Sequence, residues 1–127
     1  MNMTDRVGHP REDDRGAIMV EFALIVPILL ILLLGIIEFG RAYNTQISLQ
    51  GAAREGARAL ALGNSAADAV DASSGVAITV SSTSGCPDGD SNAYATVTTA
   101  AEFTFGIPFV DLGTKTLHAT ASMRCGL

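Results

Sequence analysis

One run of twenty-one residues, 17–37, constrains this chain more than any other feature. It reads AIMVEFALIVPILLILLLGII and contains a single ionisable residue, Glu21. As a helix it is about 30 Å long, which matches the hydrocarbon core of a bilayer. A secretory signal has a shorter apolar core with a small-residue cleavage site close behind it, and no convincing site follows here. We therefore predict a transmembrane helix that is retained.

The residues on either side of this run differ in character. Residues 1–16 (MNMTDRVGHPREDDRG) are polar and lack apolar periodicity, so we expect a disordered leader. Residues 38–63 contain no helix breaker, and Gly63 with Asn64 forms a stop signal. We therefore expect the helix to continue into water. Small or apolar residues recur there at helical spacing, at Ala42, Leu49, Ala52, Gly56 and Ala59. A helix cannot bury such a stripe alone, so it must pack against something.

Beyond Ser65 the period of the sequence changes. A short helical remnant or linker (66–72) precedes three runs with β-strand character, at 76–82, 94–105 and 115–125. Turn-forming sequences, GCPDGDSN and GIPFVDLG, separate these runs. We predict an α+β fold, in which a long N-terminal helix is followed by a small antiparallel three-stranded β domain over residues 64–127. The sheet should pack on the soluble part of the helix.

The chain has two cysteines, Cys86 and Cys125, both outside the apolar run. They are either two free thiols or one disulfide. A chain anchored in a membrane, with its C-terminal domain on the oxidising side, favours the disulfide. Large side chains are scarce in this part of the chain, so we expect a thin core that depends on such a bond.

Charge gives weaker guidance. The formal net charge is −5, so no basic surface points to nucleic acid. Arginines lie on both sides of the apolar run, and the positive-inside rule barely decides the orientation. The cysteine pair and the small C-terminal domain favour a cytoplasmic N-terminus and an extracytoplasmic C-terminal domain.

Glu21 at the edge of the apolar run has an ordinary explanation. It lies about 6 Å from the start of a helix that begins at Ala17, so its carboxylate reaches the headgroups at little cost. Negative charge is also favourable near a helix N-terminus. On this explanation Gly16 is an ordinary loop residue before the helix.

A family resemblance offers a second explanation for Gly16 and Glu21. A charged leader ending in Arg15-Gly16, then AIMVE and an apolar helix, resembles the class III (prepilin-type) signal of type IV pilins. Residues 15–63, with the signatures EFALIVP and AAREGAR, more specifically resemble TadE-like pseudopilins of the tight-adherence (Tad/Flp) pilus system. The C-terminal third carries no such motif.

The resemblance implies a sequence of events. A prepilin peptidase would cut between Gly16 and Ala17, which makes Glu21 the fifth residue of the mature chain. Cleavage exposes an α-amino group that is largely cationic at neutral pH. A neighbouring subunit's Glu21 would pair with this amine, because an unpaired carboxylate among apolar helices is costly. The implied partners are the peptidase, other pilin-like subunits, the Tad assembly platform and the lipid bilayer.

Two further features of the helix allow alternatives. Pro27 cannot donate a hydrogen bond to the Ala23 carbonyl, so it is either a tolerated membrane proline or a functional hinge. Glu38 and Arg41 are three residues apart where the apolar run ends. They are predicted to form an ordinary helical ion pair at the outer interface, although pairing between subunits is a second possibility.

The sequence shows no catalytic constellation. His9 and His118 are isolated, and Asp88, Asp90 and Asn92 begin a calcium-loop pattern that then fails. We expect no enzyme activity, no cofactor and no metal. The preferred function is a pilin-like structural or assembly subunit of a Tad pilus. The alternative is a signal-anchored membrane protein whose β domain is a surface binding module.

Overall fold

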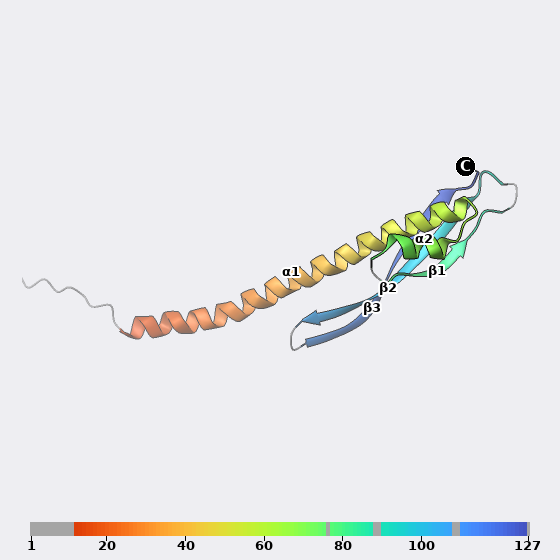
Figure 1. Cartoon of the computed structure of the whole chain (residues 1–127). Coiled ribbons are helices and arrows are strands. Elements are labelled where there is room, and N and C mark those ends of the chain that lie inside the picture. Colours follow the sequence, from red (N-terminus) through yellow and green to blue (C-terminus); the bar gives the residue numbers. More distant parts are fainter. Residues whose placement is uncertain (1–11, 76, 88–89, 108–109, 127) are drawn as a thin grey trace, which may run out of the picture. The chain divides into compact units, whose positions relative to one another are not determined.

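The structure, a computed structural model, describes residues 12–75, 77–87, 90–107 and 110–126 of the 127-residue chain (Figure 1). It confirms the predicted α+β fold, with a long helix followed by a small antiparallel sheet. The elements are α1 (Glu12–Ala61), α2 (Ala66–Ser73), β1 (Thr79–Ser84), β2 (Tyr94–Ile107) and β3 (Val110–Arg124). Contacts divide the chain into two units, one up to Ile36 and one from Ile37 onward. The second unit, which we call the head, contains the last part of α1, α2 and the sheet.

Helix α1 begins earlier than the sequence predicts. It starts at Glu12 instead of Ala17, so residues 12–16 of the expected disordered leader are helical. Negative charge is favourable near a helix N-terminus, as at Asp14, and the helix continues through Gly16. Residues 1–11, which make up the rest of the expected leader, lie outside the described residues.

The end of α1 follows the predicted stop signal. The helix ends at Ala61, and Gly63 takes a left-handed φ of 78°. The backbone N–H of Asn64 donates to the Ala59 carbonyl at 2.8 Å, which satisfies one of the last carbonyl groups of the helix. The chain then turns into α2, where the hydroxyl of Ser65 accepts a hydrogen bond from the Asp68 N–H as the helix N-cap.

The three strands form the predicted antiparallel sheet, and their order in it is β1-β2-β3. Strands β2 and β3 are longer than expected, and β3 already begins at Val110. The predicted second turn, GIPFVDLG, is therefore largely strand, apart from residues 108–109, which are not described. The pairing register of β2 with β3 shifts between Thr104 and Gly106, as at a β-bulge. This irregularity lies at the start of the segment whose glycines and proline predicted a turn.

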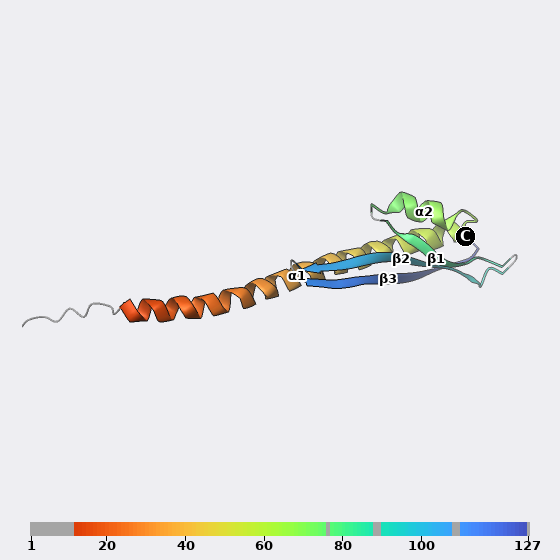
Figure 2. The same ribbon diagram turned by 90° about the horizontal axis from the view of Figure 1, so that it is seen from below.

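The core of the head lies between the helices and one face of the sheet. Figure 2 shows α2 and the last part of α1 on the same side of the strands. The side chains that fill this space are small or branched, so the core is thin. They are Leu49, Ala52, Ala57, Ala66, Val70, Ile78, Val97, Ala101 and Ala119. The predicted stripe on the helix is the buried face, with Leu49 and Gly56 at its centre.

Gly56 permits the close packing of this layer. A Cβ atom at position 56 would lie 3.0 Å from Cγ2 of Val70 and 3.2 Å from Cγ1 of Val97. The glycine that weakens α1 locally therefore allows α2 and β2 to approach it. Nearby, the buried hydroxyl of Thr99 donates to the Leu49 carbonyl at 3.0 Å, which ties β2 to α1 and satisfies the only polar side chain that is buried among the described residues.

Candidate functional site

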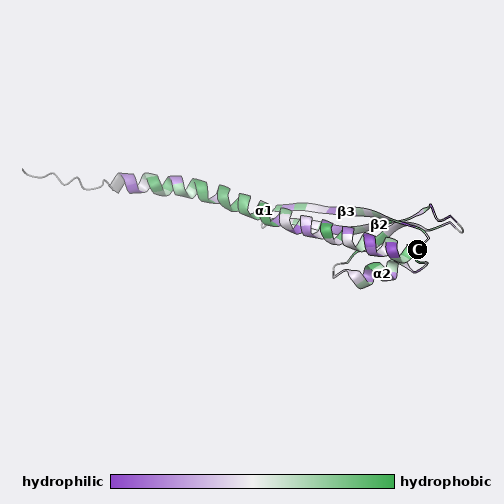
Figure 3. Ribbon diagram, turned by 90° about the horizontal axis from the view of Figure 1, so that it is seen from above, coloured by the Kyte–Doolittle hydropathy of each residue, from purple (hydrophilic) through white to green (hydrophobic). Residues whose placement is uncertain are grey.

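The first candidate site is the apolar surface of α1 within residues 17–37. Most of its large apolar side chains are exposed, from 46% for Ile25 to 76% for Met19. Figure 3 shows this part of α1 coloured predominantly as hydrophobic. Monomeric soluble proteins rarely expose apolar surface on this scale. By length and composition α1 is able to cross a membrane, and no part of its apolar window is buried by the described protein. These properties agree with a single-pass membrane protein.

Gly16, Ala17 and Glu21 lie near the N-terminal end of this helix. All three are exposed, and a Cβ atom built on Gly16 has no other atom within 4 Å. The described residues provide no ion-pair partner for the Glu21 carboxylate. The fold of the single chain therefore does not explain the identity of any of these residues.

Pro27 lies inside α1, which continues through it as one helix. The carbonyl of Ala23 loses its usual N–H partner there. The continuous helix is compatible with both alternatives, a tolerated membrane proline and a functional hinge, so each stays a prediction.

Glu38 and Arg41 form the predicted ion pair where the apolar run ends. Nη1 of Arg41 donates to Oε1 of Glu38 at 2.7 Å. The Glu38 side chain is only 12% exposed, and its Oε2 has no hydrogen-bond partner among the described residues. The guanidinium of Arg41 also stands 5.5 Å from the ring centre of Phe103, a cation–π contact between α1 and β2. The pair is thus a helical ion pair that also helps to orient the sheet.

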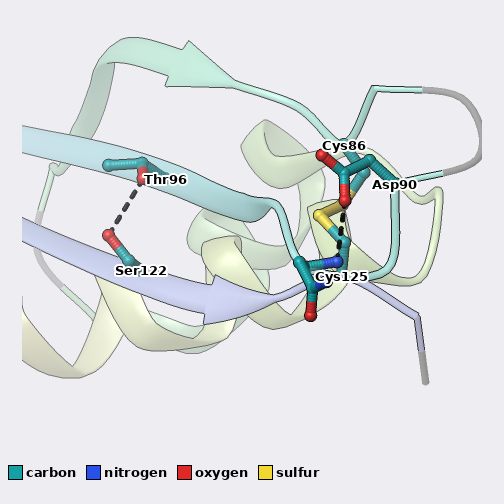
Figure 4. Close-up of a disulfide and its surroundings, with 6 residues drawn as sticks. Cys86, Asp90, Thr96, Ser122 and Cys125 are labelled. Atoms are coloured by element: carbon teal, nitrogen blue, oxygen red, sulfur yellow. Dashed lines mark hydrogen bonds between the residues drawn. A yellow bond between two sulfur atoms is a disulfide. The ribbon is translucent and has the colours of Figure 1, made fainter.

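The second candidate site is the disulfide end of the head (Figure 4). Cys86 and Cys125 are bonded, with their Cα atoms 5.8 Å apart, so the structure contains the predicted disulfide. The bond joins the loop after β1 to the end of β3. The backbone N–H of Cys125 donates to the Ala93 carbonyl at 2.9 Å, and Thr96 and Ser122 share a hydroxyl hydrogen bond of 2.9 Å across β2 and β3.

The described part of the acidic loop beside this disulfide contains a local turn at Asp90–Asn92. Oδ1 of Asp90 accepts a hydrogen bond from the Asn92 N–H at 2.9 Å, which is a local Asx turn. Asp88 lies outside the described residues. Within the described part of the chain, no three His, Cys, Asp or Glu side chains converge as metal ligands.

Of the two histidines, the structure describes His118. His118 is exposed on β3, where its backbone carbonyl accepts a hydrogen bond from Gln46 Nε2 at 2.9 Å. His9 lies outside the described residues. The contacts of Gln46 with His118 and of Arg41 with Phe103 could not be predicted from the sequence, because each joins residues far apart in the chain and no local pattern indicates them.

Comparison with known proteins gives one match. No curated protein and no solved structure matches the chain. A family model described as TadE-like protein matches residues 16–58, from the glycine of the proposed cleavage site through the AAREGAR signature. The α2 helix and the sheet lie outside this match. The resemblance predicted from the sequence is therefore confirmed for residues 16–58, which carry the pattern of the TadE-like protein family.

Proposed function

We propose that this chain is a pilin-like structural or assembly subunit of a tight-adherence (Tad/Flp) pilus. The observation that carries the proposal is the TadE-like match over residues 16–58, which covers the exposed apolar segment of α1. A helix with this surface requires lipid or other helices around it. A pilin-like subunit meets both environments, because lipid surrounds it in the bilayer and the helices of other subunits surround it in the assembly.

The proposed mechanism begins with cleavage by prepilin peptidase between Gly16 and Ala17. The new N-terminus places a cationic amine four residues before Glu21, about 6 Å away along the helix. When subunits assemble, the Glu21 carboxylate of one chain pairs with the Ala17 amine of its neighbour. Because Glu21 has no ion-pair partner among the described residues, its carboxylate is available for this contact. Pairing selects one register between helices, since an unpaired charge between apolar helices is unfavourable.

The proposed arrangement in the cell follows from the same features. Residues before Ala17 face the cytoplasm, residues 17–37 span the membrane, and the head is extracytoplasmic. The disulfide supports this orientation, because such bonds persist in oxidising compartments. The partners are the prepilin peptidase, the Tad assembly platform, other pilin-like subunits and the bilayer. The role is structural and involves no catalysis by the chain itself.

Replacing Glu21 with glutamine tests the pairing. Loss of one partner from a buried charge pair costs about 3 kcal/mol, so incorporation into pili should fall on the order of a hundredfold. The measurement is the amount of the protein in sheared pili relative to the amount in cells, with the mature N-terminus checked by mass spectrometry.

Two variants control for the substitution. Glu21→Asp keeps the charge and should retain most incorporation. Glu55→Gln makes the same chemical change at an exposed position of the head, and its incorporation should be unchanged. Normal incorporation of a correctly processed Glu21→Gln protein would show that the pairing does not operate.

A further inference from the structure

An apolar tip ends the hairpin formed by β2 and β3. We define it by Phe105, Ile107, Val110 and Leu112. Ile107 and Val110 are direct cross-strand partners, and side chains two residues apart in a strand share a face, so the four lie on one face of the hairpin. Val110 is 50% exposed and Leu112 is 59% exposed, while Phe105 and Ile107 are half-buried. Among the other described strand residues, Tyr94 at the far end of β2 is also an exposed large hydrophobic residue, but it stands alone, whereas the tip residues are grouped.

Contacts within the head show which way the tip points. Starting near the end of α1, Val97 lies against Gly56, and the Thr99 hydroxyl then bonds to the Leu49 carbonyl. Further along β2, the ring of Phe103 receives the Arg41 guanidinium. Strand β2 therefore runs antiparallel to the part of α1 in the head, toward its Ile37 end.

The tip extends past the last of these contacts. Ile107 follows Phe103 by four positions in the strand, a distance of about 13 Å. Ile37 precedes Arg41 by four positions in the helix, a distance of about 6 Å. Because Phe103 contacts the Arg41 side chain, these lengths carry the tip at least to the level of Ile37, where the apolar run of α1 ends.

We propose that the apolar tip of the β2–β3 hairpin inserts into the interface of the bilayer that α1 spans. This inference rests on the membrane-spanning role of α1 in the proposed function. Lipid is present at this level around every membrane-resident copy, whereas a protein partner is present only in some states. Contact with the acyl boundary would cover side chains that no described residue covers, and it would hold the head against the membrane as a second attachment beside α1.

The polar groups of the tip fit an interfacial depth. Asp111 lies between Val110 and Leu112, and its Oδ1 accepts a hydrogen bond from the Gly113 N–H at 2.8 Å. Lys115 follows on the same strand, opposite Phe103. Both charges are within reach of headgroups and water while the apolar side chains point to the hydrocarbon. Insertion is therefore shallow and does not depend on anionic lipid.

The test uses the full-length protein, with its disulfide intact, in phosphatidylcholine vesicles. Cysteine is introduced at Leu112 and labelled with an environment-sensitive fluorophore. Quenching is then measured with nitroxide-labelled lipid and, separately, with iodide in the water. Thr83→Cys, an exposed position on β1 that pairs with Val97, is the matched control on the head. Ile31→Cys reports whether α1 spans the bilayer.

The proposal predicts a blue-shifted emission for the Leu112 label, strong quenching by nitroxide lipid and protection from iodide. The Thr83 label should show the opposite behaviour, and adding Val110→Asp should reduce the lipid quenching of the Leu112 label. If the Ile31 label is quenched by lipid and the Leu112 label is open to iodide, the hairpin proposal is wrong and the membrane span stands. If neither label is quenched, both are wrong. Shielding of Leu112 that disappears on dilution of protein into excess lipid would assign the tip to a second copy and overturn the proposal.

Discussion

The Gly16→Leu protein is expected to keep residues 1–16 on nearly every molecule. A leucine side chain in place of glycine would prevent the proposed peptidase from cutting the bond to Ala17. The measurement is the intact mass of the protein from cells with active prepilin peptidase. Loss of cleavage would also abolish its incorporation into pili, because the amine that pairs with Glu21 would never form.

The structure makes this substitution informative. Position 16 is exposed in α1, and an added Cβ meets no atom within 4 Å, so leucine does not disturb the fold. Leucine even favours a helix over glycine by about 1 kcal/mol. Gly35→Leu is the matched control, since Gly35 lies in the same helix and is equally free of neighbours. The Gly35 variant should be processed normally. Efficient cleavage of the Gly16→Leu protein would contradict the proposed site.

Removal of the disulfide is expected to have the largest effect on the stability of the head. The bond between Cys86 and Cys125 closes a loop with a sequence separation of 39 residues. Replacing both cysteines with alanine should lower the free energy of unfolding of the head by about 4 kcal/mol. That is a large share of the total for a small domain. Urea unfolding of the full-length protein in detergent, followed by circular dichroism of the sheet, measures the difference.

Reduction of the unaltered protein distinguishes the effect of losing the disulfide bond from the effect of replacing the two cysteine side chains. If the bond itself carries the effect, reduced protein and the double alanine variant should unfold at similar urea concentrations. Thiol labelling before and after reduction should show no free thiol at first and two afterwards, consistent with the bonded pair in the structure. Equal stability of the oxidised and reduced proteins would show that the packed core alone maintains the head.

Much of the fold was predictable because its signals are local. The apolar run and the stripe around Leu49 predict one long helix, and alternation in 94–105 and 115–125 predicts two neighbouring strands. The break at Gly63 was predictable for the same reason, since a left-handed residue ends a helix.

The differences arise where local signals compete or where contacts are distant. Gly16 suggested that the helix starts after it, yet α1 already begins at Glu12. Glycines and Pro108 suggested a long turn, whereas pairing between β2 and β3 continues to Ile107 and Val110. Gly56 was predicted to lie in the stripe that packs, but its neighbours Val70 and Val97 could not be predicted because they come from other elements.

The candidate site divides in the same way. The proposed roles of Gly16, Ala17 and Glu21 rest on the sequence resemblance alone, and no contact within the described chain adds to it. The direction of the hairpin tip, in contrast, depends on the contact of Arg41 with Phe103, which the sequence does not show. The three N-terminal residues are proposed to contact other proteins, so a single chain does not reveal their roles. The direction of the hairpin depends on packing within the chain, which the structure does reveal.

Two functions remain to be separated by experiment. A pilin-like subunit loses its leader, whereas a signal-anchored binding module uses α1 only as a tether and has no need for cleavage after Gly16. Both would keep the same head and the same disulfide. The chemistry at the N-terminus is the feature that differs.

The most direct test is mass spectrometry of the N-terminus of the protein isolated from cells with active prepilin peptidase. The proposed function predicts a mature chain that begins at Ala17, with the leader absent. A protein that retains residues 1–16 in those cells would contradict the central claim, and the signal-anchored binding module would then be the better account.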